Sequence, residues 1–175
     1  MAYQLPDEAI LKELDQRVDE QLTVSGHCAQ TSFAVLDEQF QLEGGATLKA
    51  LTPFPGIALR GETCGAVIGC MMALGLVFGR DDLEDTSGFF NSLPPAREFC
   101  RQFEQQVGST NCHDILESDL GEAFDLSKQV EFQKYRECGG IESCSQVIRN
   151  GVRIAAKIIL DQEKSEPDQG VMLTV

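Results

Sequence analysis

The sequence predicts an all-α fold: an irregular bundle of five to seven helices around a buried apolar helix rich in glycine and alanine, residues 62–79. Apolar residues recur at spacings of three and four along most of the chain, and no segment alternates as a strand does. With 175 residues, 42% of them hydrophobic, the chain is long enough for one domain with its own core. We expect a single helical domain over residues 1–162 and a flexible tail over residues 163–175.

Two amphipathic helices are predicted in the first part of the chain. In the first, residues 7–22, every fourth residue is apolar, and acidic residues at its start suit the positive end of the helix dipole. The second helix, residues 27–42, presents Phe33, Leu36 and Phe40 on one face, and Gly44 with Gly45 ends it. A short helix is then expected over residues 46–51.

Residues 52–61 (TPFPGIALRG) contain two prolines and two glycines, so we expect a loop there. The apolar helix 62–79 follows, with Gly65, Gly69 and Ala73 in a strip of small side chains. Such a strip allows either another helix or a flat cofactor to approach the backbone closely. Residues 63–79 carry no charge but are barely long enough to cross a bilayer, so a buried helix is favoured over a membrane span.

The second half of the chain contains the remaining helices. A polar connection is expected over residues 81–95, and a helix from Pro95 to Val107. One or two helical turns follow within residues 109–121, capped by Ser109 or Asn111. Two further helices are predicted over residues 126–136 and 141–160, separated by Gly139 and Gly140.

The acidic composition excludes some classes of partner. The net charge is −14 and Lys and Arg are not clustered, so neither nucleic acid nor an anionic membrane surface is an expected ligand. Residues 1–16 lack the basic and apolar regions of a secretory signal, so we expect a cytoplasmic protein. In a reducing compartment, seven cysteines point to metal binding or redox chemistry rather than to structural disulfides.

Four of the seven cysteines are predicted near the starts of helices, and no Cys-x-x-Cys pair occurs. Free N–H groups and the helix dipole at such positions stabilise the thiolate, the form that binds metals and attacks disulfides. These four are therefore the candidate catalytic residues and metal ligands, and the fold must bring them together from distant segments. They are Cys28, Cys64, Cys112 and Cys144.

Other residues are candidates of a second rank. Cys138 precedes two glycines whose flexibility would let it reach a metal site, whereas Cys70 and Cys100 suit ordinary core packing. His27 and His113 adjoin candidate cysteines and would supply mixed ligands or lower a thiol pKa; the alternative is that they point away to the surface. Gly65 and Gly69 are candidate cofactor-binding positions, because they leave space beside Cys64.

Four stretches of the chain, residues 26–36, 60–79, 111–121 and 142–159, resemble the redox-active protein family named for the pattern Cys…Gly-Cys-Ala-x-x-Gly…Cys…Cys (C_GCAxxG_C_C). The most specific stretch is RGETCGAVIGCMMALGLVFG, although it reads Cys-Gly-Ala where the family name has Gly-Cys-Ala. The resemblance assigns the family cysteines to the same four positions. It implies redox activity, and the family name specifies no reaction.

Three functions remain open from the sequence. The first is an electron-transfer protein in which the four cysteines bind an iron–sulfur cluster or another thiolate-bound metal. The second is a metal-free thiol–disulfide oxidoreductase, and the third is a non-catalytic helical interaction protein with cysteines in its core. An unidentified redox partner is expected in the first two cases, and the apolar helix could also serve a homodimer.

Overall fold

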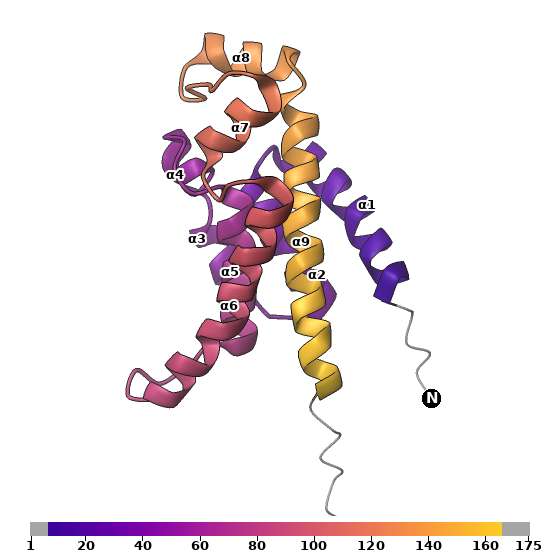
Figure 1. Ribbon diagram of the computed structural model, residues 1–175, viewed down its shortest axis with the longest axis vertical. Coiled ribbons are helices and arrows are strands. Elements are labelled where there is room, and N and C mark those ends of the chain that lie inside the picture. Colours follow the sequence, from indigo (N-terminus) through magenta and orange to yellow (C-terminus); the bar gives the residue numbers. More distant parts are fainter. Residues whose placement is uncertain (1–6, 166–175) are drawn as a thin grey trace, which may run out of the picture.

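The computed structural model describes residues 7–165, and this part of the chain folds into nine helices without a strand (Figure 1). The helices are α1 (Asp7–Ser25), α2 (Cys28–Phe40), α3 (Gly45–Ala50), α4 (Gly56–Leu59), α5 (Gly65–Phe78), α6 (Thr86–Val107), α7 (Cys112–Leu120), α8 (Gln129–Glu137) and α9 (Gly140–Ser165). The helical class is confirmed. The predicted number of five to seven is too low, because connections between the long helices are themselves wound into short helices.

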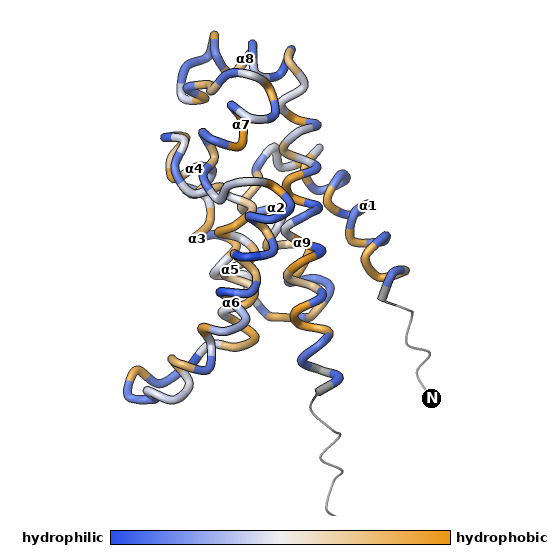
Figure 2. The backbone as a smooth tube through the Cα atoms, in the orientation of Figure 1, coloured by the Kyte–Doolittle hydropathy of each residue, from blue (hydrophilic) through white to orange (hydrophobic). Residues whose placement is uncertain are grey.

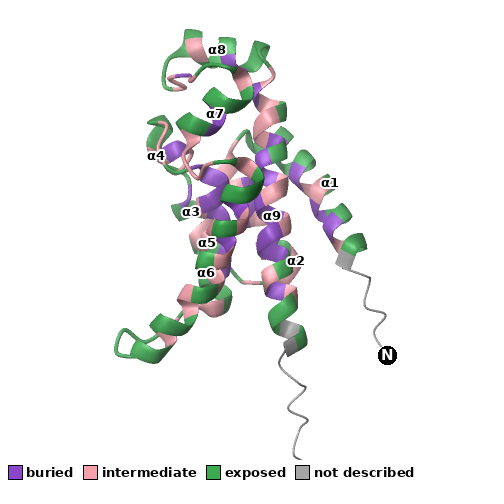
Figure 3. Cartoon of the chain, viewed as in Figure 1, coloured by how far each residue is buried: buried purple, intermediate pink, exposed green. Residues whose placement is uncertain are grey.

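The long helix α9 runs through the molecule and organises the core. In Figure 1, α1 lies on one side of α9, α5 and α6 lie on the other, and α7 and α8 sit at one end. Buried residues lie along the inner faces of these helices (Figure 3). The fully buried members of the main core include Leu14, Val18, Phe33, Leu36, Ala66, Ala73, Phe99, Phe103, Ile148 and Val152.

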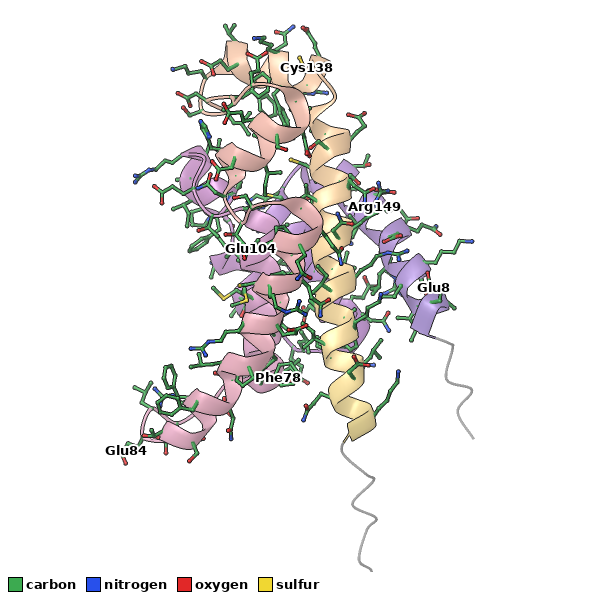
Figure 4. All side chains as sticks on the ribbon, in the orientation of Figure 1. Glu8, Phe78, Glu84, Glu104, Cys138 and Arg149 are labelled. Atoms are coloured by element: carbon green, nitrogen blue, oxygen red, sulfur yellow. The ribbon has the colours of Figure 1, made fainter. Side chains whose placement is uncertain are left out.

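Ion pairs fasten α1 along α9. Arg153 donates to both carboxylate oxygens of Asp15, at 2.6 and 2.8 Å. One turn away, Arg149, labelled in Figure 4, lies 2.8 Å from Asp19. Because a bidentate pair fixes both side chains in one geometry, these contacts set the register of α1 against α9.

Helix α5 packs most extensively against α2. A Cβ atom at Gly69 would collide with Ser32 Oγ and with the carbonyl oxygen of Ala29. The strip of small residues therefore accommodates the backbone of another helix at Gly69. At Gly65 the same strip meets a sulfur, because a Cβ atom there would collide with Cys28 Sγ.

The predicted buried helix corresponds to α5, but only one of its faces is buried. Met72, Leu76 and Val77 are exposed on its outer face. Figure 2 shows this helix as apolar over most of its length. No other described element covers the outer face. No helix within residues 7–165 combines the length and apolar character needed to span a membrane.

Helix α6 begins nine residues before the predicted start at Pro95. The Asp85 side chain caps it by accepting a hydrogen bond from Gly88 N at 2.8 Å. Pro94 and Pro95 lie inside the helix and each removes one backbone donor. The residues four positions earlier, Phe90 and Asn91, are exposed, so water can satisfy their carbonyl groups and the helix continues.

Other boundaries differ less from the prediction. The helices predicted over residues 46–51 and 126–136 correspond to α3 and α8 with ends shifted by one to three residues, α7 lies within residues 109–121 as expected, and Asn111 caps it. Helix α9 continues to Ser165, so residues 163–165 of the expected tail are helical. The rest of that tail, residues 166–175, lies outside the described residues.

The packing of α5 against α2 predicts opposite effects for two glycine substitutions. Gly69→Ala should destabilise the protein by about 1–3 kcal/mol, because the added methyl group overpacks a closed interface. Gly75→Ala, on the same helix with nothing within 4 Å of the added carbon, should stabilise it by roughly 0.5–1 kcal/mol through helix propensity. Urea unfolding of both variants measures the difference, and equal effects would contradict the packing described.

Candidate functional site

The segments before α5 and α7 pair with each other and bring two cysteines together. Thr63 and Asn111 form an isolated antiparallel bridge. Cys64 N donates to Thr110 O at 2.8 Å, and Cys112 N donates to Glu62 O at 2.7 Å. These hydrogen bonds place Cys64 at the start of α5 beside Cys112 at the start of α7.

Helices α2 and α9 bring the other two cysteines to the same place. Cys28 is the first residue of α2, and its sulfur fills the space that Gly65 leaves open. Cys144 lies one turn into α9, on the side that faces α7 and α8. Electrostatic interactions connect every pair among Cys28, Cys64, Cys112 and Cys144. The fold therefore gathers into one cluster the four cysteines that the sequence singled out.

The four-cysteine cluster borders an apolar pocket. Cys28, Cys112 and Cys144 line it, and Cys64 is buried next to them with 7% of its surface exposed. No acidic, basic or histidine side chain lines this pocket. The other lining residues are Leu22, Gly26, Pro55, Gly56, Leu59, Gly61, Leu116, Phe124, Leu126, Phe132, Tyr135 and Ile141.

One wall of the pocket is a left-handed turn, α4, where the sequence predicted an open loop. Gly56, Ile57, Ala58 and Leu59 have φ angles between 50° and 62°. Three of these residues carry side chains, so the turn costs steric energy that its surroundings must offset. Hydrogen bonds of 2.8 Å from Leu59 N to Pro55 O and from Ala58 N to Pro53 O hold it closed. Strain of this kind concentrates at functional sites.

Burial controls the charge state of the cluster. Together with the neighbouring thiols, it raises the pKa of Cys64 and of Cys112 to about 12 each. Burial also raises the pKa of Cys28 and Cys144. N–H groups at the helix starts lower the pKa of Cys28 and Cys64, as expected from the sequence, but burial outweighs them. The thiols are therefore protonated at neutral pH when no cation is bound, so the expectation of ready thiolates is wrong for the metal-free protein.

An aromatic group that the sequence analysis missed covers one side of the cluster. Tyr135 in α8 is buried against Phe124 and Phe132, with ring centroids 6.0 and 5.9 Å away. Its hydroxyl donates to Gly140 O at 2.7 Å and lies 3.0 Å from Cys144 Sγ. The only sequence signal was an aromatic pair, Phe132 and Tyr135, three residues apart on an otherwise polar helix.

The remaining cysteines lie apart from this pocket. Cys70 is fully buried in the main core, where burial raises its pKa, and Cys100 is half-buried beside that core. Cys138 is exposed where α8 ends, as Figure 4 shows, and does not line the pocket. Gly69 does not line it either, because α2 covers that position.

The two histidines have other partners. The Nδ1 atom of His27 caps α2 by accepting from Gln30 N at 3.1 Å, and its Nε2 atom lies 2.9 Å from the carbonyl oxygen of Thr52. Both ring nitrogens of His27 are thus engaged in joining α2 to the segment after α3. The His113 side chain is 55% exposed, with Nδ1 3.5 Å from Asp114. Neither histidine lines the cysteine pocket.

Within residues 7–165, no group of three or more His, Cys, Asp or Glu side chains is arranged to hold a metal ion.

A helical fold that gathers buried thiols from four helices around an apolar pocket defines a class of small all-α proteins with a cysteine-based site. Within this class the chain belongs to the family described as "Putative redox-active protein (C_GCAxxG_C_C)", whose model matches residues 26–158. The matched region contains all four cysteines of the cluster. No curated protein and no solved structure gives a significant match to the chain.

The raised thiol pKa values predict that the reduced, metal-free protein loses stability in alkali. Below pH 9 the thiols are protonated in both the folded and the unfolded states, so their contribution to the free energy of unfolding does not change with pH. Between about pH 9 and 12 the unfolded state releases these protons first, and each of Cys64 and Cys112 should cost up to about 1.4 kcal/mol per pH unit. Urea midpoints at pH 8.5 and 10.5 measure the loss.

Cys64→Ala should reduce this alkaline loss, and Cys138→Ala, at an exposed thiol, is the matched control. Equal pH dependence in the wild type and in Cys64→Ala would contradict a protonated buried cluster.

Proposed function

We propose that this protein is a redox protein in which Cys28, Cys64, Cys112 and Cys144 bind an iron–sulfur cluster and thereby accept and donate electrons. The observation that carries the proposal is the convergence of four cysteines at the starts of α2, α5, α7 and α9. Three of them line one apolar pocket, and Cys64 is buried next to them. When bound, such a cluster supplies one-electron oxidation and reduction.

The chemistry of the four thiols fits a cationic ligand. Deprotonated together, they would place four negative charges in a buried space, and no basic side chain lines the pocket to offset them. A positively charged iron centre removes this repulsion and lowers the pKa of each thiol that binds it. The apolar walls would then limit the access of water to the centre, which influences its reduction potential.

Four cysteine thiols are a donor set that suits either a single zinc ion or an iron–sulfur cluster. Zinc has no redox chemistry, whereas an iron–sulfur cluster exchanges electrons. We therefore choose the cluster, because the family is described as redox-active.

A metal-free dithiol is the second candidate, and the paired backbones of Cys64 and Cys112 favour it. A disulfide between them would join the starts of α5 and α7, which already share hydrogen bonds. The pKa values weigh against it, because a thiol with a pKa of about 12 is a poor source of attacking thiolate at neutral pH.

A cellular setting follows from the proposal. Because oxidising conditions would pair free thiols, the site suits a reducing compartment such as the cytoplasm. The net charge of −14 favours a redox partner with a basic face.

Iron analysis of protein purified without oxygen tests the proposal. We expect brown protein with absorbance near ~400 nm and with iron and acid-labile sulfide in a fixed ratio to the chain. Alanine at any one of Cys28, Cys64, Cys112 and Cys144 should remove most of the iron. Cys138→Ala should retain it, because that thiol lies outside the pocket.

Two other outcomes would contradict the proposal. Colourless protein in which oxidation joins Cys64 to Cys112 would replace the cluster with the dithiol reaction. Iron that survives each of the four cluster substitutions would place the centre elsewhere and overturn the proposed site.

A further inference from the structure

The hydroxyl group of Tyr135 lies beside the sulfur of Cys144 and has two hydrogen-bond acceptors within reach. It lies 2.7 Å from the carbonyl oxygen of Gly140 and 3.0 Å from Cys144 Sγ. A phenol carries a single proton, so it can donate fully to only one acceptor at a time. A carbonyl oxygen only accepts, whereas a cysteine sulfur donates as a thiol and only accepts as a thiolate. Both acceptors lie within hydrogen-bond distance of this one hydroxyl, so Tyr135 is placed to donate to the sulfur of Cys144.

The surroundings of Tyr135 hold its hydroxyl at this position. Only 4% of the residue is exposed, and its ring is packed between Phe124 and Phe132. A Cβ atom at Gly140 would collide with the Tyr135 ring, so the absence of a side chain there lets the ring reach α9. A hydroxyl fixed in this way needs little reorganisation when the charge on the sulfur changes.

Tyr135 is the one hydroxyl-bearing residue among those that line the cysteine pocket. The other lining residues, apart from the cysteines, are glycine, proline, aliphatic or phenylalanine side chains. Asp119 is the acidic group that acts on Cys144 from α7, and its charge opposes negative charge on that sulfur. Tyr135 is thus the side chain positioned to stabilise electron density on Cys144.

We propose that Tyr135 is a positioning residue for the redox centre: it donates its hydroxyl proton to the Cys144 sulfur when that sulfur is a ligand, and so raises the reduction potential of the centre. This inference rests on the proposed function, because it assigns a role to Tyr135 at the same site. A hydrogen bond to a ligand sulfur withdraws electron density and favours the reduced state, which carries one more electron. In the metal-free protein the hydroxyl is within hydrogen-bond distance of both Gly140 O and Cys144 Sγ, so it already stands at the sulfur.

Tyr135→Phe tests the role because it removes the hydroxyl and retains the ring. We expect the variant to bind iron as the wild type does and to have a more negative midpoint potential in anaerobic spectroelectrochemistry. The shift should correspond to about a tenfold change in the redox equilibrium, or about 59 mV for one electron. Phe89→Leu changes an exposed aromatic ring on α6, outside the cysteine pocket, and its potential should match the wild type.

A modification that shifts the midpoint potential in the opposite direction provides a second test if Tyr135→Phe folds poorly. The chain has only two tyrosines, so 3-fluorotyrosine incorporated into a Tyr3→Phe background labels Tyr135 alone. The fluorinated phenol is a stronger donor and should move the potential to a more positive value. Movement in the same direction as Tyr135→Phe, or none, would overturn the assignment.

The contact also has a readout that needs no iron. In metal-free protein labelled with ¹³Cζ-tyrosine, Tyr135→Phe identifies the Tyr135 signal, and Cys144→Ala should shift it while Cys138→Ala leaves it unchanged. An unmoved signal in Cys144→Ala would show that the hydroxyl does not engage this sulfur, and would overturn the inference.

The two proposals fail in different ways. If wild-type protein binds the cluster but Tyr135→Phe leaves the potential unchanged, the role of Tyr135 is wrong and the proposed function stands. If wild-type protein and both Tyr135 variants take up no iron, the proposed function is wrong and the role of Tyr135 at a metal centre is overturned with it.

Discussion

The close approach of α5 to α2 is the contact on which the site depends. Gly69 removes the side chain that would otherwise meet Ser32 and the backbone of α2, so the two helices pack backbone to backbone. One turn earlier, Gly65 leaves room for the sulfur of Cys28. The same pair of glycines therefore closes the core and sets Cys28 beside Cys64. The contact that closes the core between α2 and α5 is therefore also the contact that assembles the site.

The burial that stabilises the fold also makes the thiol cluster unusual. Four thiols around an apolar pocket remain neutral while they hold their protons, and the metal-free protein is then compatible with a dry interior. If they lose those protons, they need compensating positive charge that the pocket lining does not provide. The raised pKa values thus weigh against free thiolates in the metal-free protein, and under the proposed function the binding of a cationic centre would be coupled to stability.

The second layer of the site comes from α4 and α8, two elements with no cysteine in the pocket. The left-handed turn of α4 brings Gly56 against Cys112, where a Cβ atom would lie 3.3 Å from the sulfur. Helix α8 adds the ring and hydroxyl of Tyr135. Both elements belong to segments of low apolar periodicity, which explains why the sequence drew attention to the cysteines and left their surroundings undescribed.

The sequence by itself determined the helical class, most helix positions and the four cysteines, because apolar spacing and helix-start signals are local properties of the chain. It misplaced the start of α6, since a proline pair within an exposed helix resembles a helix start, and it assigned a loop where α4 turns left-handed. Only the tertiary structure decided that Cys138, His27 and His113 stand away from the pocket and that Tyr135 faces Cys144. Those outcomes depend on contacts between residues far apart in the chain, and on burial, which reversed the pKa shift that helix position alone predicts.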